Sequence, residues 1–201
     1  MQVTTLGAHH RAAAVRTLTA AFWDYPESTH LLPDEHRRRR VLPAYLRSDC
    51  ADALRHDALL GVVEGDDVVG AAAWIPPGAY PVDLAGQVRQ ALRLVPIAPW
   101  GIGALREALR GQASNRAAHR RDPHWWLQAI GIDPARQRAG VGAALLTPIL
   151  ERADADGVGC YLSTATADNA AWYGRHGFTV LSSYRPTPTW PQVWAMWRDP
   201  R

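Results

Sequence analysis

A loop between a predicted strand and a predicted helix carries the residues best suited to chemistry in this sequence. The loop and the start of the helix read Gln137-Arg138-Ala139-Gly140-Val141-Gly142, and Arg136 adds a further positive charge. Backbone N–H groups at the start of a helix have no partner within it, and the helix dipole adds positive potential there. The segment therefore predicts a site for an anion such as a pyrophosphate. The alternative is a glycine turn that only lets the helix pack close to the strand.

The spacing of apolar residues predicts the elements that hold this loop. A strand is expected over Trp125–Ile132 and a helix from Val141 to about Asp154, so the glycines follow a strand and open a helix. Hydrophobic spacing and turn residues predict further strands over 3–6, 59–64, 68–74, 161–164, 178–184 and 193–197, and helices over 10–22, 34–54, 84–95, 102–119 and 169–176. Asp34 is the expected N-cap of the helix over 34–54. This order predicts one mixed α/β domain over residues 1–201, in which a helical, proline-containing insertion over 75–123 covers a site.

Two motifs in this order resemble those of the GCN5-related N-acetyltransferases, which bind acetyl-CoA. Gln137–Gly142 matches the family's Q/R-x-x-G-x-G/A motif, and Asn169–Phe178 matches its N-x-x-x-Y-x-x-x-G-F segment. The resemblance covers most of the chain. It implies a mixed, mostly antiparallel sheet with splayed central strands and flanking helices. A narrower similarity to the puromycin N-acetyltransferase group comes from residues 14–18 and 22–26, from Pro148, and from residues 193–198.

The resemblance assigns roles to residues of this chain. The pantetheine arm of acetyl-CoA would pair with the edge of the strand over 127–132, through main-chain groups of Ile130 and Ile132, where that strand splays from the one over 161–164. The pyrophosphate would lie on the N–H groups of Arg138 to Gly142. Asn169 would hydrogen-bond the pantetheine, and Tyr173 would lie near the thioester sulfur.

The implied reaction is direct attack of an amine on the thioester carbonyl, polarised by a main-chain N–H group. A phenol can share its proton with the leaving thiolate, so Tyr173 is the expected acid, unless it only fills the core. The amine must lose a proton, and Asp24, Glu27 and His30 follow the first helix, where the family often places acceptor-site residues. Glu27 and His30 are the candidate bases, and solvent is an equal alternative.

Aromatic residues near the first helix predict the acceptor pocket. Trp23 and Tyr25 combine with residues 96–100 of the insertion, which end in a tryptophan. Trp and Tyr offer broad apolar faces with a polar edge, and such faces suit a flat amine. The alternative is that these aromatic residues belong to the core. We expect a small-molecule amine, such as an antibiotic or another secondary metabolite. The first alternative is an enzyme that acetylates protein N-termini or lysines, and the second is a non-catalytic acyl-CoA-binding regulatory module.

Composition limits the remaining functions. The chain has 201 residues, 47% of them hydrophobic and 20% charged, which is typical of a soluble globular protein. A net charge of +3 is too small to indicate nucleic-acid binding, even with the run of charge over 36–40, which we expect on a solvated helix face. No long apolar run or signal-peptide pattern is present, and two unpaired cysteines, Cys50 and Cys160, fit a reducing cytoplasm. No metal site is expected, and the protein is predicted to be a monomer or a homodimer.

Overall fold

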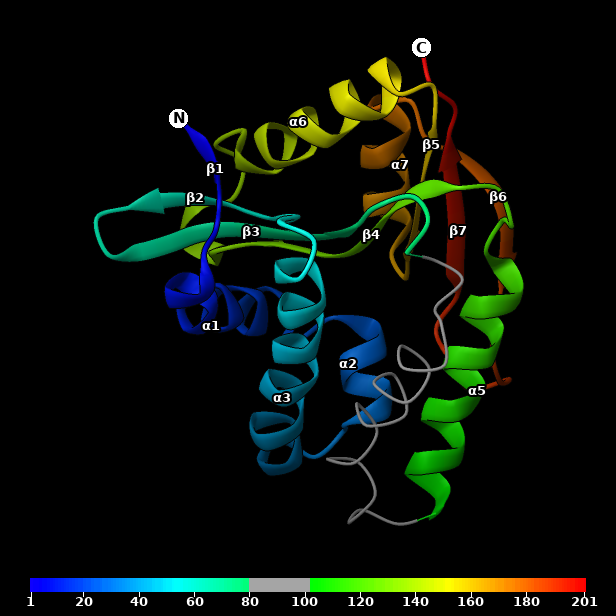
Figure 1. Cartoon of the computed structure of the whole chain (residues 1–201). Helices are drawn as coiled ribbons and strands as arrows, with labels where there is room; N and C mark the ends of the chain where they lie inside the picture. The colour runs from blue at the N-terminus through cyan, green and yellow to red at the C-terminus, as the bar shows by residue number, and fades with distance from the viewer. Residues whose placement is uncertain (80–101) are drawn as a thin grey trace.

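Seven strands form a single mixed sheet in the order β1-β2-β3-β4-β5-β7-β6 (Figure 1). The computed structural model describes residues 1–79 and 102–201. The strands are β1 (Val3–Thr5), β2 (Leu59–Glu64), β3 (Asp67–Ile75), β4 (His124–Ile132), β5 (Gly159–Thr164), β6 (Thr179–Tyr184) and β7 (Val193–Arg198). The α-helices are α1 (Arg11–Phe22), α2 (Pro26–Leu31), α3 (Glu35–Leu54), α5 (Ile102–Ala118), α6 (Val141–Ala155) and α7 (Ala167–Arg175), with 3₁₀ turns η1 (Ala8–His10) and η3 (Pro134–Arg136).

The strand pairings confirm the predicted fold class. Every neighbouring pair in the sheet is antiparallel except β4 and β5, which run parallel. The parallel pair begins at His124 with Gly159 and ends at Leu127 with Leu162. Beyond that point β4 continues to pair with β3 as far as Ile132, while β5 continues to pair with β7. The two central strands therefore separate, as predicted.

A bulge in β4 lies at the point of separation. Ala73 of β3 pairs with Ala129, but the next residue, Trp74, pairs with Leu127. Gln128 is thus an extra residue in β4, opposite no residue of β3. A β-bulge bends its strand and increases the local twist, which directs β4 away from β5.

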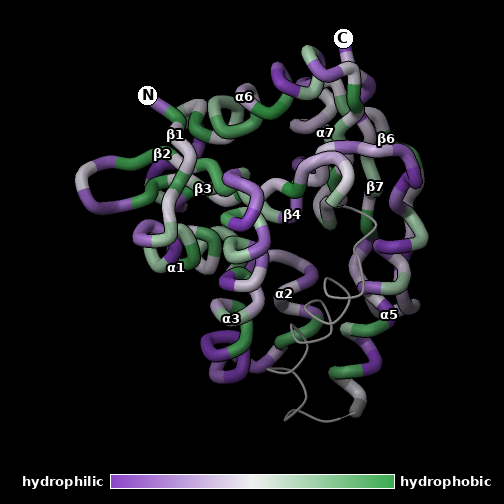
Figure 2. The backbone as a smooth tube through the Cα atoms, in the orientation of Figure 1, coloured by the Kyte–Doolittle hydropathy of each residue, from purple (hydrophilic) through white to green (hydrophobic). Residues whose placement is uncertain are grey.

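Helices cover both faces of the sheet and bury two main cores (Figure 1). On one face α1 and α3 pack on residues such as Ala71 and Ala73. On the other, α6 packs on Ala72 and Trp74. Because both faces are covered, every residue of β3 after Asp67 is buried. Figure 2 shows the same pattern, with hydrophobic colour along β3 and much of α6 and hydrophilic colour on the β2–β3 turn and at the start of α3.

Local sequence signals predict most of these boundaries. Asp34 caps α3 by accepting a hydrogen bond from Arg37 N at 2.8 Å. The predicted helix over 102–119 is observed as α5, and α7 begins two residues earlier than predicted because the Thr166 side chain caps it. The prediction missed α2, which starts with Pro26 at its first position, where a missing N–H and a fixed φ favour a helix. The helix predicted over 84–95 lies outside the described residues.

Within residues 1–79 and 102–201, no helix is both long and apolar enough to cross a membrane.

Candidate active site

A cavity of about 780 Å³ opens where β4 and β5 separate. One end is formed by the loop after β4 and by α7, with the wall residues Gln137, Arg138, Asp168, Asn169 and Trp172. The middle is formed by β4 over residues 126–132, by Ser163 and Thr164 of β5, and by Tyr173. The other end is enclosed by α1, α2, α3 and α5 and by the segment between β6 and β7. A single cavity therefore links the glycine loop to a chamber beneath the sheet.

The cavity exposes a free strand edge. From Gln128 to Ile132, β4 has no partner in β5 among the described residues, and Ile130 and Ile132 line the cavity. An unpaired edge offers main-chain donors and acceptors to an extended ligand, as an added strand would use them. Ile130 and Ile132 therefore lie on this free edge, and their pairing with a pantetheine arm stays a prediction.

The glycine loop gives α6 an uncapped start beside this edge. Gly140 precedes the helix with a φ of +81°, a conformation that glycine adopts without strain. The first helical bond runs from Ala144 N to Gly140 O at 3.1 Å, so the amides of Val141 to Ala143 have no partner within the helix. Arg138 lines the cavity, whereas Arg136 turns away and pairs with Glu64 at 2.6 Å. The amides and Arg138 together suit a phosphate group.

Other residues of the glycine loop pack against neighbouring elements. Ala139 lies between Arg138 and Gly140. The buried Val141 side chain packs on Gly70 of β3, so closely that a Cβ added to Gly70 would lie 2.6 Å from Val141 Cγ1. A Cβ on Gly142 would lie 3.2 Å from the Trp172 ring. Glycine at 142 therefore lets α7 approach the loop, as the packing interpretation of the glycines expects at this position.

Asn169 and Tyr173 project from one side of α7 into the cavity. They are four residues apart, which places them on the same helix face. The Tyr173 side chain is buried, and burial, together with the neighbouring Tyr25, raises its pKa above the usual value for a phenol. The hydroxyl is therefore protonated throughout the physiological range.

Tyr25 joins the acceptor side of the cavity to the end of β5. Its hydroxyl accepts a hydrogen bond from Ala165 N at 2.6 Å and lies 3.0 Å from Thr164 Oγ1. Burial raises the pKa of Tyr25 to about 12. Tyr25 lines the cavity, and its hydroxyl holds the start of α2 against the sheet.

Glu27 is the acidic group of α2 that faces the cavity. It lies near Tyr25, Tyr184 and Trp190, and burial raises the pKa of its carboxyl above the usual range, while the nearby Trp190 indole opposes this rise. A carboxyl with a raised pKa is a better proton acceptor for an ammonium group than an exposed one. Asp24 is exposed and is not on the cavity wall.

His30 is not brought to the cavity wall. Its ring contacts Trp190 at 4.8 Å between centroids, and its Nε2 lies 3.5 Å from the Glu107 carboxylate of α5. Glu107 also accepts a hydrogen bond from the Thr187 hydroxyl at 3.0 Å. His30 therefore helps to join α2, α5 and the segment after β6, and its position does not support the expected role as a base.

Trp23 is also placed differently from the expectation. It lies outside the cavity, in a second groove on the outer side of α1, with the Arg38 and Arg39 guanidinium groups 4.8 and 5.8 Å from its ring centroid. Consecutive helical residues point about 100° apart, so Phe22 can face the cavity while Trp23 cannot. Arg38 is buried against this ring and donates to Leu32 O at 2.8 Å, so the charge run is not wholly solvated as predicted.

Sequence reasoning missed several polar groups on the cavity wall, among them Gln128 and Trp190. A signal existed for Gln128, because it is the single amide in an otherwise apolar strand. Trp190 carries no comparable signal, because its place depends on contacts with α5 far away in the chain.

The wall contributed by α5 includes Gln112, Asn115, Arg116 and His119, and burial lowers the pKa of His119 to about 3, so that this imidazole is neutral.

Known proteins share this architecture. Residues 16–178 match the model of the acetyltransferase (GNAT) family. A histone acetyltransferase HPA2 and related acetyltransferase from Corynebacterium glutamicum is 21% identical with a TM-score of 0.66, and the alignment covers 100% of this chain and 96% of that one. The polyamine N-acetyltransferase of Drosophila melanogaster is 13% identical (TM-score 0.68, coverage 98% and 99%), and arylalkylamine N-acetyltransferase 2 of Aedes aegypti is 11% identical (TM-score 0.70, coverage 100% and 99%). The family match spans both the glycine loop and the α7 segment, and the chain accordingly belongs to the GNAT family of acetyltransferases.

Proposed function

We propose that this protein transfers the acetyl group of acetyl-CoA to the amine of a small molecule with a flat, apolar body. One observation carries the proposal. A single cavity connects the free edge of β4 and the start of α6 to a chamber enclosed by α2, α3 and α5. Such a cavity can hold two substrates end to end, with the reacting groups at the separation of β4 and β5.

The residues present fit acetyl-CoA. The free amides at the start of α6 and the Arg138 side chain suit its pyrophosphate, and the β4 edge at Ile130 and Ile132 suits its pantetheine amides. Asn169 supplies a side-chain amide on the same wall. When bound, acetyl-CoA supplies an acetyl group activated as a thioester.

Two side chains of the cavity would move the protons of the reaction. Glu27 receives the proton that the acceptor ammonium must lose before its nitrogen can attack. A new C–N bond then forms as the C–S bond breaks, and Tyr173 gives its proton to the leaving thiolate. The second proton that the nitrogen loses on becoming an amide restores the Tyr173 phenol. The main-chain groups of β4 beside the bulge would stabilise the negative charge on the carbonyl oxygen. The products are an N-acetylated amine and a free thiol.

The walls of the chamber support a compact acceptor. Its acceptor end is lined mainly by apolar and aromatic side chains, among them Phe22, Leu42, Trp126, Tyr184 and Trp190, with Glu27 as an acidic group on α2. Structural neighbours include enzymes that act on small amines, such as the Drosophila protein that forms N-acetylagmatine. The similarity to puromycin N-acetyltransferases adds aminonucleoside antibiotics to the acceptors we propose.

A thiol-release assay tests this function. The protein is incubated with acetyl-CoA and, separately, with aminonucleosides, arylalkylamines, polyamines, amino acids and peptides. We expect thiol release and an acetylated product with at least one small amine carrying an aromatic body. Acetylation of unstructured peptides alone would favour the protein acetyltransferase, and acetyl-CoA binding without thiol release to any acceptor would favour the regulatory module.

A further inference from the structure

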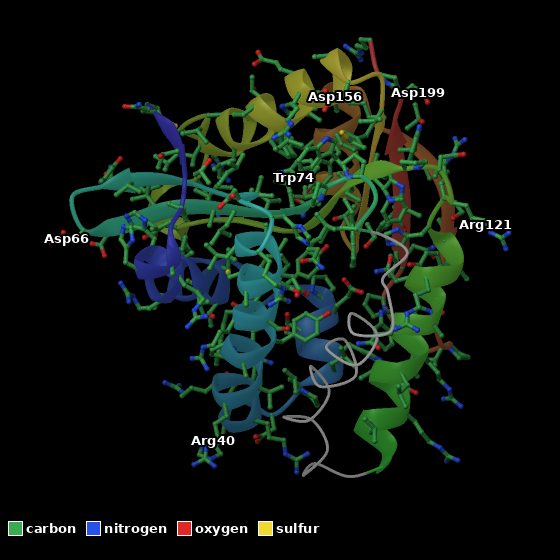
Figure 3. The ribbon with its side chains drawn as sticks, in the orientation of Figure 1. Arg40, Asp66, Trp74, Arg121, Asp156 and Asp199 are labelled. Atoms are coloured by element: carbon green, nitrogen blue, oxygen red, sulfur yellow. The ribbon has the colours of Figure 1, made fainter. Side chains whose placement is uncertain are left out.

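The Tyr25 hydroxyl connects elements that pack on opposite faces of the sheet. On one face Leu31 of α2 packs with the core beneath α1 and α3. On the other face α7 packs with α6 in the core that contains Trp74, which Figure 3 shows between the sheet and α6. Tyr25 reaches the loop between β5 and α7, beyond the last residues that pair β4 with β5. One phenol therefore joins the acceptor end of the cavity to the end formed by α7.

The hydrogen bonds of this hydroxyl use its full capacity. A phenol oxygen has two acceptor lone pairs and carries one proton. Ala165 N donates to it at 2.6 Å, Thr164 Oγ1 lies 3.0 Å away, and the Asn169 side chain is a third hydrogen-bond partner. Three partners leave neither a lone pair nor a proton of Tyr25 for a substrate. The hydroxyl is therefore suited to position other groups and not to bind the amine itself.

At the α7 end, these bonds fix the start of the helix. Ala165 is followed by Thr166, whose Oγ1 caps α7 by accepting a hydrogen bond from Asn169 N at 3.2 Å. Tyr25 thus holds both the capping loop and the Asn169 side chain on the cavity wall. Tyr173 follows one turn later on the same helix, so the helix that carries the proposed acid is fixed by the same contacts.

At the acceptor end, Tyr25 begins α2. Its carbonyl oxygen accepts the first bond of this helix, from Thr29 N at 3.0 Å. Glu27, the proposed base, lies in the first turn of α2 and on the cavity wall. Within residues 1–79 and 102–201, the hydrogen bonds from α2 and its N-cap to the loop after β5 are those of the Tyr25 hydroxyl. Its removal would break this polar link and leave the packing of the ring in place.

We infer that the Tyr25 hydroxyl is a positioning group through which a ligand at Asn169 stabilises the start of α2 and, with it, Glu27. This inference rests on the proposed function, which places acetyl-CoA at Asn169 and the amine beside Glu27. Two sites that share an ordered contact are coupled, because the first ligand orders residues that the second ligand also needs. The coupling is reciprocal, so the hydroxyl also strengthens binding at the α7 end.

Binding of CoA alone tests the inference without an amine. Tyr25→Phe keeps the ring on the cavity wall and removes the hydroxyl. We expect calorimetry to show a Kd for CoA raised about three- to tenfold, as the loss of one hydrogen bond produces. Asn169→Ala should also weaken CoA binding. Tyr25→Phe added to Asn169→Ala should cause little further loss, because the two side chains act through one contact.

Hydrogen exchange gives a readout that a merely structural role of the hydroxyl would not change. Saturating CoA should slow exchange of the α2 amides, including Thr29, at least about threefold in the unaltered protein and not in Tyr25→Phe. Thr164→Val keeps the phenol but removes one of its partners. It should show the same pattern with smaller changes, and it replaces Tyr25→Phe if that variant does not fold.

The control removes a different buried phenol. Tyr161 of β5 donates from its hydroxyl to Asn115 Oδ1 of α5 at 3.3 Å, away from α2. Tyr161→Phe should keep both the CoA affinity of the unaltered protein and the slowing of exchange in α2. Thermal unfolding verifies that each variant is folded.

Any of three results would overturn the inference. A folded Tyr25→Phe that binds CoA as tightly as the unaltered protein would show that the hydroxyl does not position the α7 end. Additive losses from Tyr25→Phe and Asn169→Ala would mean that the two side chains act independently. Slowing of α2 exchange that persists in Tyr25→Phe, or that Tyr161→Phe also abolishes, would assign the effect to general packing. An unaltered protein that binds no CoA would instead overturn the proposed function, so the two failures are distinguishable.

Discussion

At the scale of single residues, burial determines which polar groups of the cavity can handle protons. Burial raises the pKa of Tyr173 and of Glu27, whereas it lowers that of His119. A neutral phenol can give a proton to a developing thiolate, and a desolvated carboxylate can accept one from an ammonium group. The neutral His119 imidazole is too weak a base for this task.

Replacement of Tyr173 by Phe should affect turnover more than cofactor binding. The hydroxyl acts as negative charge develops on sulfur, so we expect kcat to fall about 100-fold while the Kd for acetyl-CoA changes less than about threefold. Steady-state kinetics at saturating amine and calorimetry give the two quantities. A folded variant that keeps full kcat would show that Tyr173 only packs against Trp172 and Phe178.

Replacement of Glu27 by Gln should remove one ionisation from the pH dependence of kcat/KM. Glu27 must be ionised to accept a proton, and its pKa is raised, so kcat/KM should increase with pH through a pKa above the usual carboxyl range. Glu27→Gln should lose this ionisation and lower kcat/KM by about 10²- to 10⁴-fold. Glu35→Gln, at the exposed start of α3, is the matched control and should keep the original profile. The same ionisation in Glu27→Gln would assign the proton acceptor to another group or to water.

At the scale of elements, the glycine loop combines ligand binding with packing. The first amides of α6 are available to an anion, and Gly142 leaves space for the Trp172 ring of α7. A substitution at 142 therefore has two effects that must be separated. One is steric and follows from any Cβ, while the other depends on charge.

Alanine and aspartate at position 142 separate these effects. Gly142→Ala adds a Cβ that lies 3.2 Å from Trp172 and should weaken acetyl-CoA binding slightly. Gly142→Asp adds the same Cβ and a carboxylate beside the expected pyrophosphate, so we expect an additional loss of at least about tenfold in affinity. Calorimetry at low and high salt measures both, and the difference should shrink as salt screens the charge. Equal affinities for the two variants would mean that no anion binds at this loop.

Signals that lie in consecutive residues predicted most elements of this fold. The strand, glycine loop and helix over 125–154 and the strands over 59–64 and 68–74 are observed as expected, because alternation and turn residues act locally. The same local signals did not predict that Tyr25 lines the cavity whereas Trp23 lies outside it. Their opposite placement depends on where α1 ends and α2 begins, and the start of α2 was not predicted.

At the scale of the whole molecule, the enclosure of the cavity depends on contacts between distant segments. Trp190 packs on Gly111 of α5, and His30 of α2 reaches Glu107 of the same helix. No local pattern predicts such contacts. Residues 96–100 of the insertion, which the sequence predicted for the acceptor pocket, lie outside the described residues. The resemblance to a family predicted residues of the glycine loop and α7 that line one end of the cavity, whereas the place of Trp190 at the other end is shown only by the structure.

The central claim is that one cavity holds acetyl-CoA and the amine together, and a bisubstrate analogue tests it most directly. In such an analogue an acetyl linker joins the CoA sulfur to the nitrogen of an arylalkylamine. Calorimetry should show it binding at least about 100-fold more tightly than CoA, because the second half binds without a separate association cost. Gly142→Asp should weaken both ligands, and Tyr25→Ala, which opens the acceptor wall, should weaken the analogue far more than CoA. An analogue that binds no more tightly than CoA, with an affinity that Tyr25→Ala leaves unchanged, would contradict a shared cavity.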